Sequence, residues 1–456
     1  MGNLINTSTI AAIATGTGGG VGIVRISGAD AIGITDKIFK GMRKISNLKG
    51  YTGAFGHIYD DKGALDEAVV FVYKAPHSYT GEDVCEICCH GGLFILQRVT
   101  ELLIKNGAVP AEAGEFSKRA FLNGKMTLAQ AESITSLISG ENRQAVGAAM
   151  NIKQGAVSRE IDSITNELLN QTAHITAYID YPEEGVEEVM YNEIASCVTK
   201  AKATLQKVAD NYNKGRLIRD GINTAIVGSP NVGKSTLMNL LSGYERSIVT
   251  DIAGTTRDVV EERISFGDII LNLSDTAGIR TTDDTVEKIG VQRSLDRLSN
   301  CDIVMAVFDS TKELSKDDIE LLEKLKDKLC IAICNKTDLE SKIDKDKIKQ
   351  YVPTLVEISA KDGTGIDTLE KETEKLVGIA NLSENALILA NQRQYNCVIG
   401  AINALSDAHA RLEMGETLDI ISMPLEEAID ALLELTGQKA STETIDRVFE
   451  QFCVGK

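Results

Sequence analysis

The segment GSPNVGKS at residues 228–235 constrains this chain of 456 residues more than any other. It follows the short apolar run 224–227 and precedes a helical pattern, which is the strand–loop–helix context that a phosphate-binding loop requires. In such a loop the glycines let backbone N–H groups turn towards phosphates, Lys234 meets the β- and γ-phosphates, and Ser235 ligates Mg²⁺. The segment therefore predicts an α/β domain that binds a nucleotide.

Three further motifs follow in the order expected for a guanine nucleotide site. DTAG at 275–278 ends an apolar run and places a carboxylate near the metal and a glycine N–H near the γ-phosphate. NKTD at 335–338 ends another apolar run, and SAK at 359–361 would support the base. Asp338 can accept hydrogen bonds from the ring N–H and the exocyclic amine of guanine. Because such polar pairing rejects a mismatched base by roughly 10⁴-fold, Asp338 predicts GTP rather than ATP.

The pattern before residue 120 differs from the rest of the chain. Short β-rich runs at 21–26, 68–73 and 84–89 alternate with glycine turns, which predicts a compact α+β domain. A chain of 456 residues is long enough for two or three such domains.

Helical spacing surrounds the nucleotide-binding segment on both sides. It runs from Leu128 to Tyr178 and ends before Pro182, because proline lacks a donor and restricts the preceding residue. Further helices are expected over 192–217, 390–414, 425–435 and 442–452. We therefore predict three domains, with the α/β domain inserted into a discontinuous helical domain: residues 1–122, residues 123–219 with 381–456, and residues 220–380.

Net charge and cysteine content limit the binding partners and the cellular compartment that are expected for the protein. The net charge of -18 argues against a broad surface that holds nucleic acid through phosphate charge, although a local basic patch stays open. Nine scattered cysteines predict reduced thiols. The first nine residues show no signal-peptide pattern, and no apolar run approaches ~18 residues. We expect a soluble, unexported, cytoplasmic protein.

Several longer motifs resemble a known family. They are TDIAGTTRD at 250–258, DTAG at 275–278, FCVGK at 452–456, GGVGIVRISG at 19–28, YTGEDVCE at 79–86, HGG at 90–92 and GEFSKRAFLNGK at 114–125. Together they resemble the tRNA modification GTPases of the MnmE family, also called TrmE, over essentially the whole chain.

This resemblance implies a fold and a function. The fold is multi-domain: an N-terminal α+β domain that binds a formyl-tetrahydrofolate and forms a homodimer, a helical middle domain, and a P-loop G domain inserted into it. The function is GTP hydrolysis in a complex with the FAD- and NADH-using protein MnmG (GidA), in a heterotetrameric or larger assembly. The complex adds an aminomethyl or carboxymethylaminomethyl group to C5 of the wobble uridine of certain tRNAs, with tetrahydrofolate as carbon source.

The resemblance also assigns the hydrolytic site. It implies a potassium ion in the role of an arginine finger, and Mg²⁺ held by Ser235 and Thr256. Glu287, which spacing alone would place on a solvated helix face, takes the water-positioning role that a glutamine has in Ras-like GTPases, where this chain has Ile279. The potassium ligands are Asn231, Thr250, Ile252 and Thr255, and the catalytic set is Glu287, Lys234 and Gly278. Arg257 precedes an acid and is interpreted as half of a surface ion pair.

The predicted nucleotide contacts combine the short motifs with the family pattern. They are Gly228, Asn231, Val232, Gly233, Lys234, Ser235, Thr236, Thr250, Thr255, Thr256, Asp275, Asn335, Lys336, Asp338, Ser359, Ala360 and Lys361.

Residues near both ends of the chain match the folate-binding positions of the family. These positions are Arg25, Glu86, Lys125 and Lys456, whose charges suit a pterin and a glutamate tail. Cys453 matches the terminal cysteine of the family, and we expect it to be functional without assigning its chemistry. The cluster of Cys85, Cys88, Cys89 and His90 does not predict zinc, because alternate residues of a strand face opposite sides.

Two other functions remain open at this point. The first is a ribosome-assembly GTPase in which nucleotide state gates RNA association. The second is a folate-dependent one-carbon transferase whose GTPase is regulatory.

Overall fold

The computed structural model describes residues 8–140, 142–181, 190–243, 262–274, 301–378 and 386–455. Its contacts divide the chain into two compact units. Unit 1 comprises Met1–Thr135, Lys153–Ala203 and Gln392–Lys456, and unit 2 comprises Ser136–Ile152 and Thr204–Asn391.

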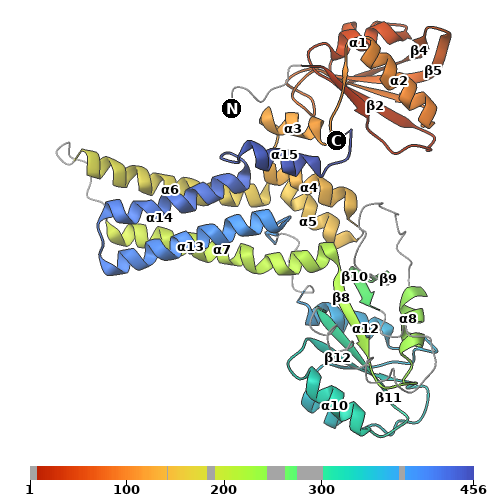
Figure 1. Cartoon of the computed structure of the whole chain (residues 1–456), viewed down its shortest axis with the longest axis vertical. Helices are drawn as coiled ribbons and strands as arrows, with labels where there is room; N and C mark the ends of the chain where they lie inside the picture. The colour runs from red at the N-terminus through yellow and green to blue at the C-terminus, as the bar shows by residue number, and fades with distance from the viewer. Residues whose placement is uncertain are drawn as a thin grey trace. The chain divides into compact units, whose positions relative to one another are not determined.

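Unit 1 begins with a seven-stranded sheet in the order β3-β4-β5-β6-β2-β1-β7 (Figure 1). Neighbouring strands are antiparallel except β1 and β7, which are parallel. The sheet and its helices are β1 (Ile10–Ile13), β2 (Gly22–Ser27), α1 (Ala31–Ile38), β3 (Phe39–Gly41), β4 (Thr52–Asp60), β5 (Gly63–Tyr73), β6 (Val84–Cys89), α2 (Leu93–Lys105) and β7 (Val109–Pro110), with the 3-10 helix Ile45–Asn47. The predicted runs 68–73 and 84–89 lie in strands, and the run 21–26 lies in β2 except for Val21.

Strand β6 shows how side-chain alternation builds the core of this sheet. Cys85, Ile87 and Cys89 are buried beside residues of α1 and α2, whereas Glu86 and Cys88 point to the other face. Burial raises the pKa of Cys85 to about 12. The alternation expected from the sequence is therefore present, and it separates Cys88 from its two neighbouring thiols.

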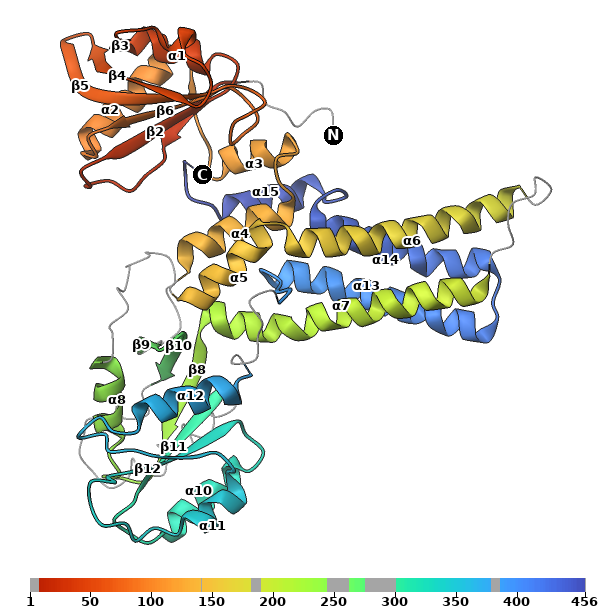
Figure 2. The ribbon, with the colours of Figure 1, turned by 180° about the vertical axis from the view of Figure 1, so that it is seen from behind.

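Long helices form the second part of unit 1. Helices α6 (Ala156–Asp180), α13 (Gln392–Met414), α14 (Leu418–Thr436) and the first part of α7 (Tyr191–Asp220) lie side by side in both views (Figures 1 and 2). Shorter helices join them: α3 (Glu115–Leu122), α4 (Leu128–Ser139) and α15 (Thr442–Glu450). Residues from α4 and α15 share a small apolar core that includes Leu128, Ile134 and Phe449.

Helix α14 begins seven residues before the predicted start at Leu425, and it contains Pro424. Proline has no N–H and leaves the carbonyl four residues earlier without its helical donor. Here that carbonyl belongs to Ile420, and it accepts a hydrogen bond from Arg411 Nη1 of α13 at 3.5 Å. The predicted helix start at Leu425 was therefore wrong, and a side chain of a neighbouring helix compensates for the donor that Pro424 lacks.

Unit 2 is built on a six-stranded sheet in the order β13-β12-β11-β8-β10-β9. Only β9 runs antiparallel to its neighbour. The elements are α5 (Arg143–Lys153), β8 (Ile222–Val227), α8 (Lys234–Gly243), β9 (Glu262–Phe266), β10 (Ile269–Ser274), β11 (Ile303–Asp309), α10 (Lys316–Leu325), β12 (Cys330–Asn335), α11 (Lys345–Tyr351), β13 (Leu355–Glu357) and α12 (Ile366–Leu376). Separate apolar cores cover the two faces of the sheet, as in other parallel α/β folds.

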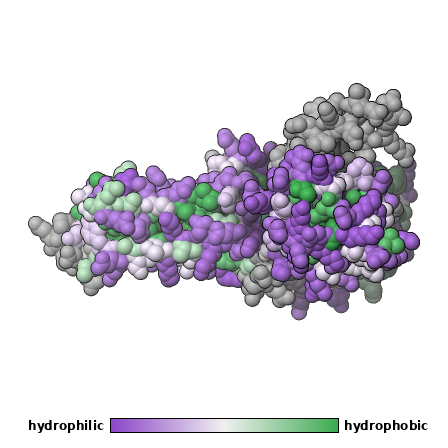
Figure 3. All heavy atoms as spheres, turned by 90° about the horizontal axis from the view of Figure 1, so that it is seen from below, coloured by the Kyte–Doolittle hydropathy of each residue, from purple (hydrophilic) through white to green (hydrophobic). Residues whose placement is uncertain are grey.

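These elements confirm the predicted fold class: an α+β N-terminal part, a helical part, and an α/β part whose sequence interrupts the helical one. The exact domain boundaries stay predictions. Among the described residues, no helix is long and apolar enough to cross a membrane. Hydrophilic residues predominate on the face drawn in Figure 3, and apolar residues are scattered between them.

Candidate functional site

The phosphate-binding loop connects β8 to α8. Gly233 has φ +99°, which L side chains rarely adopt, and a Cβ at this position would lie 2.3 Å from Asn335 Nδ2. The carbonyl of Gly233 accepts the first helical bond, from Leu237 N at 2.9 Å. Because α8 begins at Lys234, the backbone N–H groups of its first turn have no helical partner and are available to an anion.

Lys234 lies back across this loop. Its Nζ donates hydrogen bonds to the carbonyls of Gly228 at 2.8 Å and Ser229 at 2.9 Å. Burial lowers the pKa of Lys234, because the ammonium loses hydration within the loop. A phosphate group would offer this ammonium a charged acceptor in place of two neutral carbonyls.

The side chains that follow in α8 suit a nucleotide–metal complex. Ser235 and Thr236 are exposed in its first turn, so their hydroxyl groups are accessible. Val232 is buried and anchors the loop to the core of the sheet. Asn231 is exposed and has φ +64°.

Asn335 ties the base-recognition loops to the phosphate loop. Its Nδ2 donates to Val232 O at 2.9 Å, and its Oδ1 accepts from Ala360 N at 2.9 Å. The same Oδ1 accepts from Lys336 N at 2.8 Å. Asn335 is 2% exposed, so this amide joins three predicted motifs from within the protein rather than facing the ligand.

Asp338 is exposed at the end of the same loop, where it can meet a base. Ser359 Oγ lies 2.9 Å from Asp338 Oδ1 and 3.2 Å from Asp362 Oδ2. Ser359 is buried, whereas Lys361 is exposed. The hydroxyl of Ser359 therefore orients the carboxylate of Asp338 before any base is bound.

Unit 2 thus brings together the described members of the predicted nucleotide site. The remaining predicted residues lie outside the described ones: Thr250, Ile252, Thr255, Thr256, Asp275, Gly278 and Glu287. Their roles stay predictions, as does that of Lys456 at the end of the chain.

The predicted folate positions of unit 1 begin with an ion pair between neighbouring strands. Arg25 on β2 lies opposite Glu86 on β6, with Nη2 and Nε of Arg25 at 2.8 and 2.9 Å from Glu86 Oε1. Both side chains are largely shielded, with 16% and 20% of their surface exposed. The guanidinium also lies 5.3 Å from the ring centre of Tyr79 and 5.5 Å from that of Phe116.

The C-terminal tail packs onto this pair. Arg25 Nη1 donates to Gly455 O at 3.2 Å, and Val454 forms an antiparallel bridge with Ala113. A Cβ at Gly455 would lie 2.1 Å from Ile13 O, and this glycine has φ +97°. Cys453 is exposed on the same tail. A contact between residues 430 positions apart therefore places the tail that carries Cys453 against Arg25.

Lys125 is held by a different contact. Its Nζ donates to Pro76 O at 3.0 Å. The described part of the chain thus brings together Arg25, Glu86 and the tail that carries Cys453, while Lys125 approaches through the loop before Tyr79.

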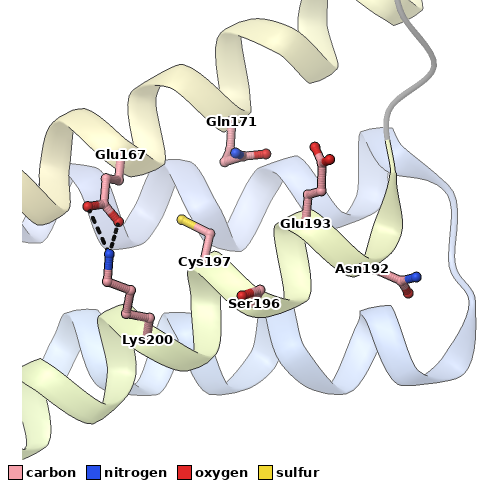
Figure 4. Close-up of a pocket in the computed structure, with 7 residues that line it drawn as sticks. All are labelled: Glu167, Gln171, Asn192, Glu193, Ser196, Cys197 and Lys200. Atoms are coloured by element: carbon pink, nitrogen blue, oxygen red, sulfur yellow. Dashed lines mark hydrogen bonds and ion pairs between the residues drawn. The ribbon is translucent and has the colours of Figure 1, made fainter.

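A separate polar groove of about 450 Å³ lies between α6 and α7 (Figure 4). It is lined by Glu167, Gln171, Asn192, Glu193, Ser196, Cys197 and Lys200. Lys200 Nζ pairs with Glu167 Oε1 at 3.3 Å, and burial raises the pKa of Cys197. None of these residues belongs to the predicted sites, and the raised pKa keeps the thiol protonated near neutral pH.

Comparisons with known proteins cover 98% of the chain. Residues 9–125 match the family model for the GTP-binding protein TrmE N-terminus, and residues 128–453 match the model for the MnmE helical domain. The chain is 40% identical over 454 residues to the tRNA modification GTPase MnmE of Clostridioides difficile, covering 98% of this chain and 99% of the relative. The chain belongs to the MnmE family of tRNA modification GTPases.

Other MnmE relatives show the same coverage. The MnmE protein of Lactococcus lactis is 40% identical over 451 residues, with 98% of each chain covered. Among solved structures, Aquifex aeolicus Era bound to GDP and AlF₄⁻ is 26% identical, with 41% of this chain and 67% of that chain covered and a TM-score of 0.26. The family resemblance noted in the sequence is confirmed, and the chain is a GTPase of tRNA modification, as its MnmE relatives are named.

Several residues that shape these sites are absent from the predicted site residues, although Ser229 and Tyr79 lie within quoted motifs. Asp309 at the end of β11 accepts from Lys336 Nζ at 2.6 Å, and Ser229 Oγ donates to Asp318 Oδ1 at 2.6 Å. Tyr79 lies against Arg25. The sequence pointed to Asp309 only through its position at the end of an apolar run. In the structure this run forms β11, which is parallel to β12 before NKTD.

Proposed function

We propose that this chain hydrolyses GTP to drive a conformational cycle during modification of C5 of the wobble uridine in certain tRNAs. The product carries an aminomethyl or carboxymethylaminomethyl group. The observation that carries the proposal is the 40% identity to MnmE proteins over 98% of the chain. The geometry of unit 2 supports it, since the side chain of Asn335 in the guanine loop is hydrogen-bonded to the backbone of the phosphate loop and of the SAK segment.

Nucleotide binding is assigned to residues of the guanine loop, the phosphate loop and the first turn of α8. Asp338, oriented by Ser359, pairs with guanine, and the free N–H groups of the first turn of α8 hold phosphate oxygens. Lys234 exchanges its two loop carbonyls for the β- and γ-phosphates. The desolvation cost of burying the Lys234 ammonium is then offset by the negatively charged phosphates.

Mg²⁺ suits the donor set at the start of α8. Ser235 presents an accessible hydroxyl oxygen, which is the kind of ligand that this hard cation prefers. Thr256 is the second proposed ligand. The ion would neutralise charge on the β- and γ-phosphates when bound.

Potassium is the second proposed cation. Asn231 fits it in chemistry, because an exposed side chain on the phosphate loop offers an amide oxygen. Thr250, Ile252 and Thr255 would complete the site, and a cation there would supply positive charge beside the phosphates. Glu287 positions the attacking water, with Gly278 beside the γ-phosphate.

We assign the tetrahydrofolate site to unit 1. Arg25 and Glu86 offer a donor fork and a carboxylate beside the rings of Tyr79 and Phe116, a combination that suits a flat, hydrogen-bonding pterin. Lys125 and Lys456 suit the glutamate tail of a 5-formyl-tetrahydrofolate. The docked tail, which also carries Cys453, lies against Arg25, and Cys453 is assigned no chemistry.

The remaining partners come from the family. The chain is proposed to act as a homodimer with the FAD-dependent protein MnmG and with tRNA, in a heterotetrameric or larger complex. The localisation proposed for this assembly is the cytoplasm.

The test is nucleoside mass spectrometry of bulk tRNA from cells that lack this chain. Wild-type chain should restore C5-modified wobble uridine, whereas Asp338→Asn should not, because it can no longer pair with guanine. An unchanged nucleoside profile in the deletion strain would reject the modification role and favour a ribosome-assembly switch.

The proposed potassium site has its own test. GTP turnover should fall sharply when KCl is replaced by NaCl at equal ionic strength, because the ligand set is assigned to K⁺ and Na⁺ is a smaller ion. Equal turnover in the two salts would reject the potassium ligands while leaving GTP binding intact.

A further inference from the structure

Asp309 lies at the C-terminal end of β11, between the phosphate loop and the guanine loop. It belongs to none of the predicted motifs. Its carboxylate is only 5% exposed, and Oδ1 accepts from Thr311 N at 3.1 Å and from Thr311 Oγ at 2.7 Å. Oδ2 accepts from Lys336 Nζ at 2.6 Å. The carboxylate therefore has one oxygen fixed by its own turn and the other turned towards the guanine loop.

Lys336 carries this contact on to the phosphate loop. The same Nζ donates to Asn231 O at 2.9 Å, so one ammonium bridges the two loops. Lys336 and Asn231 have φ values of +68° and +64°. Non-glycine residues other than asparagine seldom adopt this left-handed conformation, so contacts around Lys336 stabilise it there.

The charges of these groups support a shared role. Desolvation works against the ionised form of Asp309, but the hydrogen bonds from Lys336 and Thr311 outweigh it, and the pKa of Asp309 falls below its ordinary value. Lys312 is a weak second partner, because its Nζ lies 3.9 Å away and 69% of its side chain is exposed. Lys336 is therefore the main cationic partner of this buried carboxylate among the described residues.

We propose that Asp309 is a positioning residue of the nucleotide site, which holds Lys336 across the phosphate loop and thereby sets the backbone of Asn231. The consequence is a coupling between guanine recognition and the cation position. The expected effect on cation binding rests on the proposed role of Asn231 as a potassium ligand. The expected effect on nucleotide binding does not depend on that role.

Removing the charge of Asp309 should release this bridge. Lys336 is one-third exposed and would turn to solvent, which leaves Asn231 O without its donor and the phosphate loop less constrained. Bound GDP should then dissociate faster, although Asp309 is not assigned any contact with it.

The first experiment measures the dissociation of a fluorescent GDP analogue from the full chain. Asp309→Asn should raise the dissociation rate on the order of tenfold, the effect of losing one charge-assisted hydrogen bond. Asp309→Glu, which keeps the charge, should recover part of this loss. The matched control is Asp302→Asn at the other end of β11, where Asp302 pairs with Arg216 at 2.8 Å.

Melting temperatures of the variants separate positioning from general instability. If Asp309→Asn and Asp302→Asn melt alike but only the former releases GDP quickly, the positioning role is supported. Equal dissociation rates for wild type and Asp309→Asn overturn it. Equal acceleration by both variants also overturns it, since the effect would then be a general loosening of the sheet.

A second experiment tests the cation part by binding rather than turnover. KCl is titrated while the fluorescent GDP analogue forms its complex with aluminium fluoride, which imitates the transferring phosphoryl group. Asp309→Asn should require severalfold more KCl than wild type or Asp302→Asn. An identical KCl requirement overturns the coupling, and a wild type that is insensitive to KCl rejects the potassium ligands themselves while leaving the GDP result standing.

Discussion

The nucleotide site of unit 2 and the Arg25–Glu86 site of unit 1 are assembled in different ways. In unit 2 the residues predicted to face the ligand lie within short motifs at the ends of parallel strands of one sheet. In unit 1 the corresponding residues come from β2, β6 and the C-terminal tail, and Arg25 contacts residues 61 and 430 positions away. The first site depends mainly on local backbone geometry, whereas the second depends on long-range packing.

This difference separates two kinds of information in the sequence. A phosphate loop needs particular residues at fixed spacing, because backbone N–H groups must converge on one anion. An ion pair between an arginine and a glutamate on two strands needs no fixed spacing along the sequence. Variants should therefore have large, ligand-specific effects in unit 2, and smaller effects that mix stability with binding in unit 1.

The largest effect is expected from Asp338→Asn. An amide in place of the carboxylate presents an N–H to a guanine N–H, so GDP affinity should fall by up to roughly 10⁴-fold. Xanthine nucleotides carry a carbonyl in place of the exocyclic amine of guanine, so they should bind to this variant better than guanine nucleotides. Isothermal titration with both nucleotides measures this exchange.

The matched control for Asp338 is Asp362→Asn, since Ser359 Oγ also lies 3.2 Å from Asp362 Oδ2. It should change GDP affinity only slightly. Similar losses in the two variants would show that charge near the base, rather than pairing with guanine, decides specificity.

The next effect should come from Gly233→Ala. A Cβ would lie 2.3 Å from Asn335 Nδ2 at φ +99°, so the loop must move and the link from Asn335 to Val232 is strained. GDP affinity should fall about a hundredfold, corresponding to ~3 kcal/mol. Competition with a fluorescent nucleotide would measure it.

Gly243→Ala at the end of α8 is the control for this loop variant, because no described residue beyond its neighbours in α8 lies within 4 Å of the added Cβ. It should bind GDP like wild type. If Gly233→Ala also binds GDP like wild type, the site of unit 2 does not depend mainly on local backbone geometry.

A smaller effect is expected from Glu86→Gln in unit 1. It leaves Arg25 largely buried without its charged partner, which should lower the free energy of unfolding by about 1–3 kcal/mol. Binding of 5-formyl-tetrahydrofolate should weaken as well. Thermal unfolding and titration of the full chain would show both changes.

Glu67→Gln on β5 provides the comparison for Glu86, because 63% of the Glu67 side chain is exposed beside His57. Its unfolding should match wild type. If Glu86→Gln weakens folate binding without altering stability, the Arg25–Glu86 pair acts on the ligand alone and resembles the unit 2 site more closely.

The smallest effect is expected from Gly455→Ala. A Cβ at this residue would lie 2.1 Å from Ile13 O, so the tail should leave its docked position at a cost of roughly 1–2 kcal/mol. Carboxypeptidase should then digest the C-terminus faster. Val454→Ala, at a side chain that is 58% exposed, should be digested like wild type, and equal rates for both would contradict tail docking through Gly455.

Much of the fold could be predicted from periodicity. The strand at 84–89, the strands before DTAG and NKTD and the helical character after residue 128 followed from β-rich runs, apolar runs and three-to-four-residue spacing, since burial imposes these patterns. The helix start before Pro424 could not, because the Arg411 contact that compensates for its missing donor comes from another helix. The short strand β7 has no pattern of its own and exists through pairing with β1.

The sequence by itself determined the fold class, the phosphate loop, the guanine specificity and the family, because each depends on residue types at fixed local spacing. Only the tertiary structure decided that Asn335 joins three motifs from inside, that Asp309 reaches the phosphate loop through Lys336, and that Gly455 closes on Arg25. These contacts join segments that are far apart along the chain. Their partners are selected by strand order and packing, which no local pattern records.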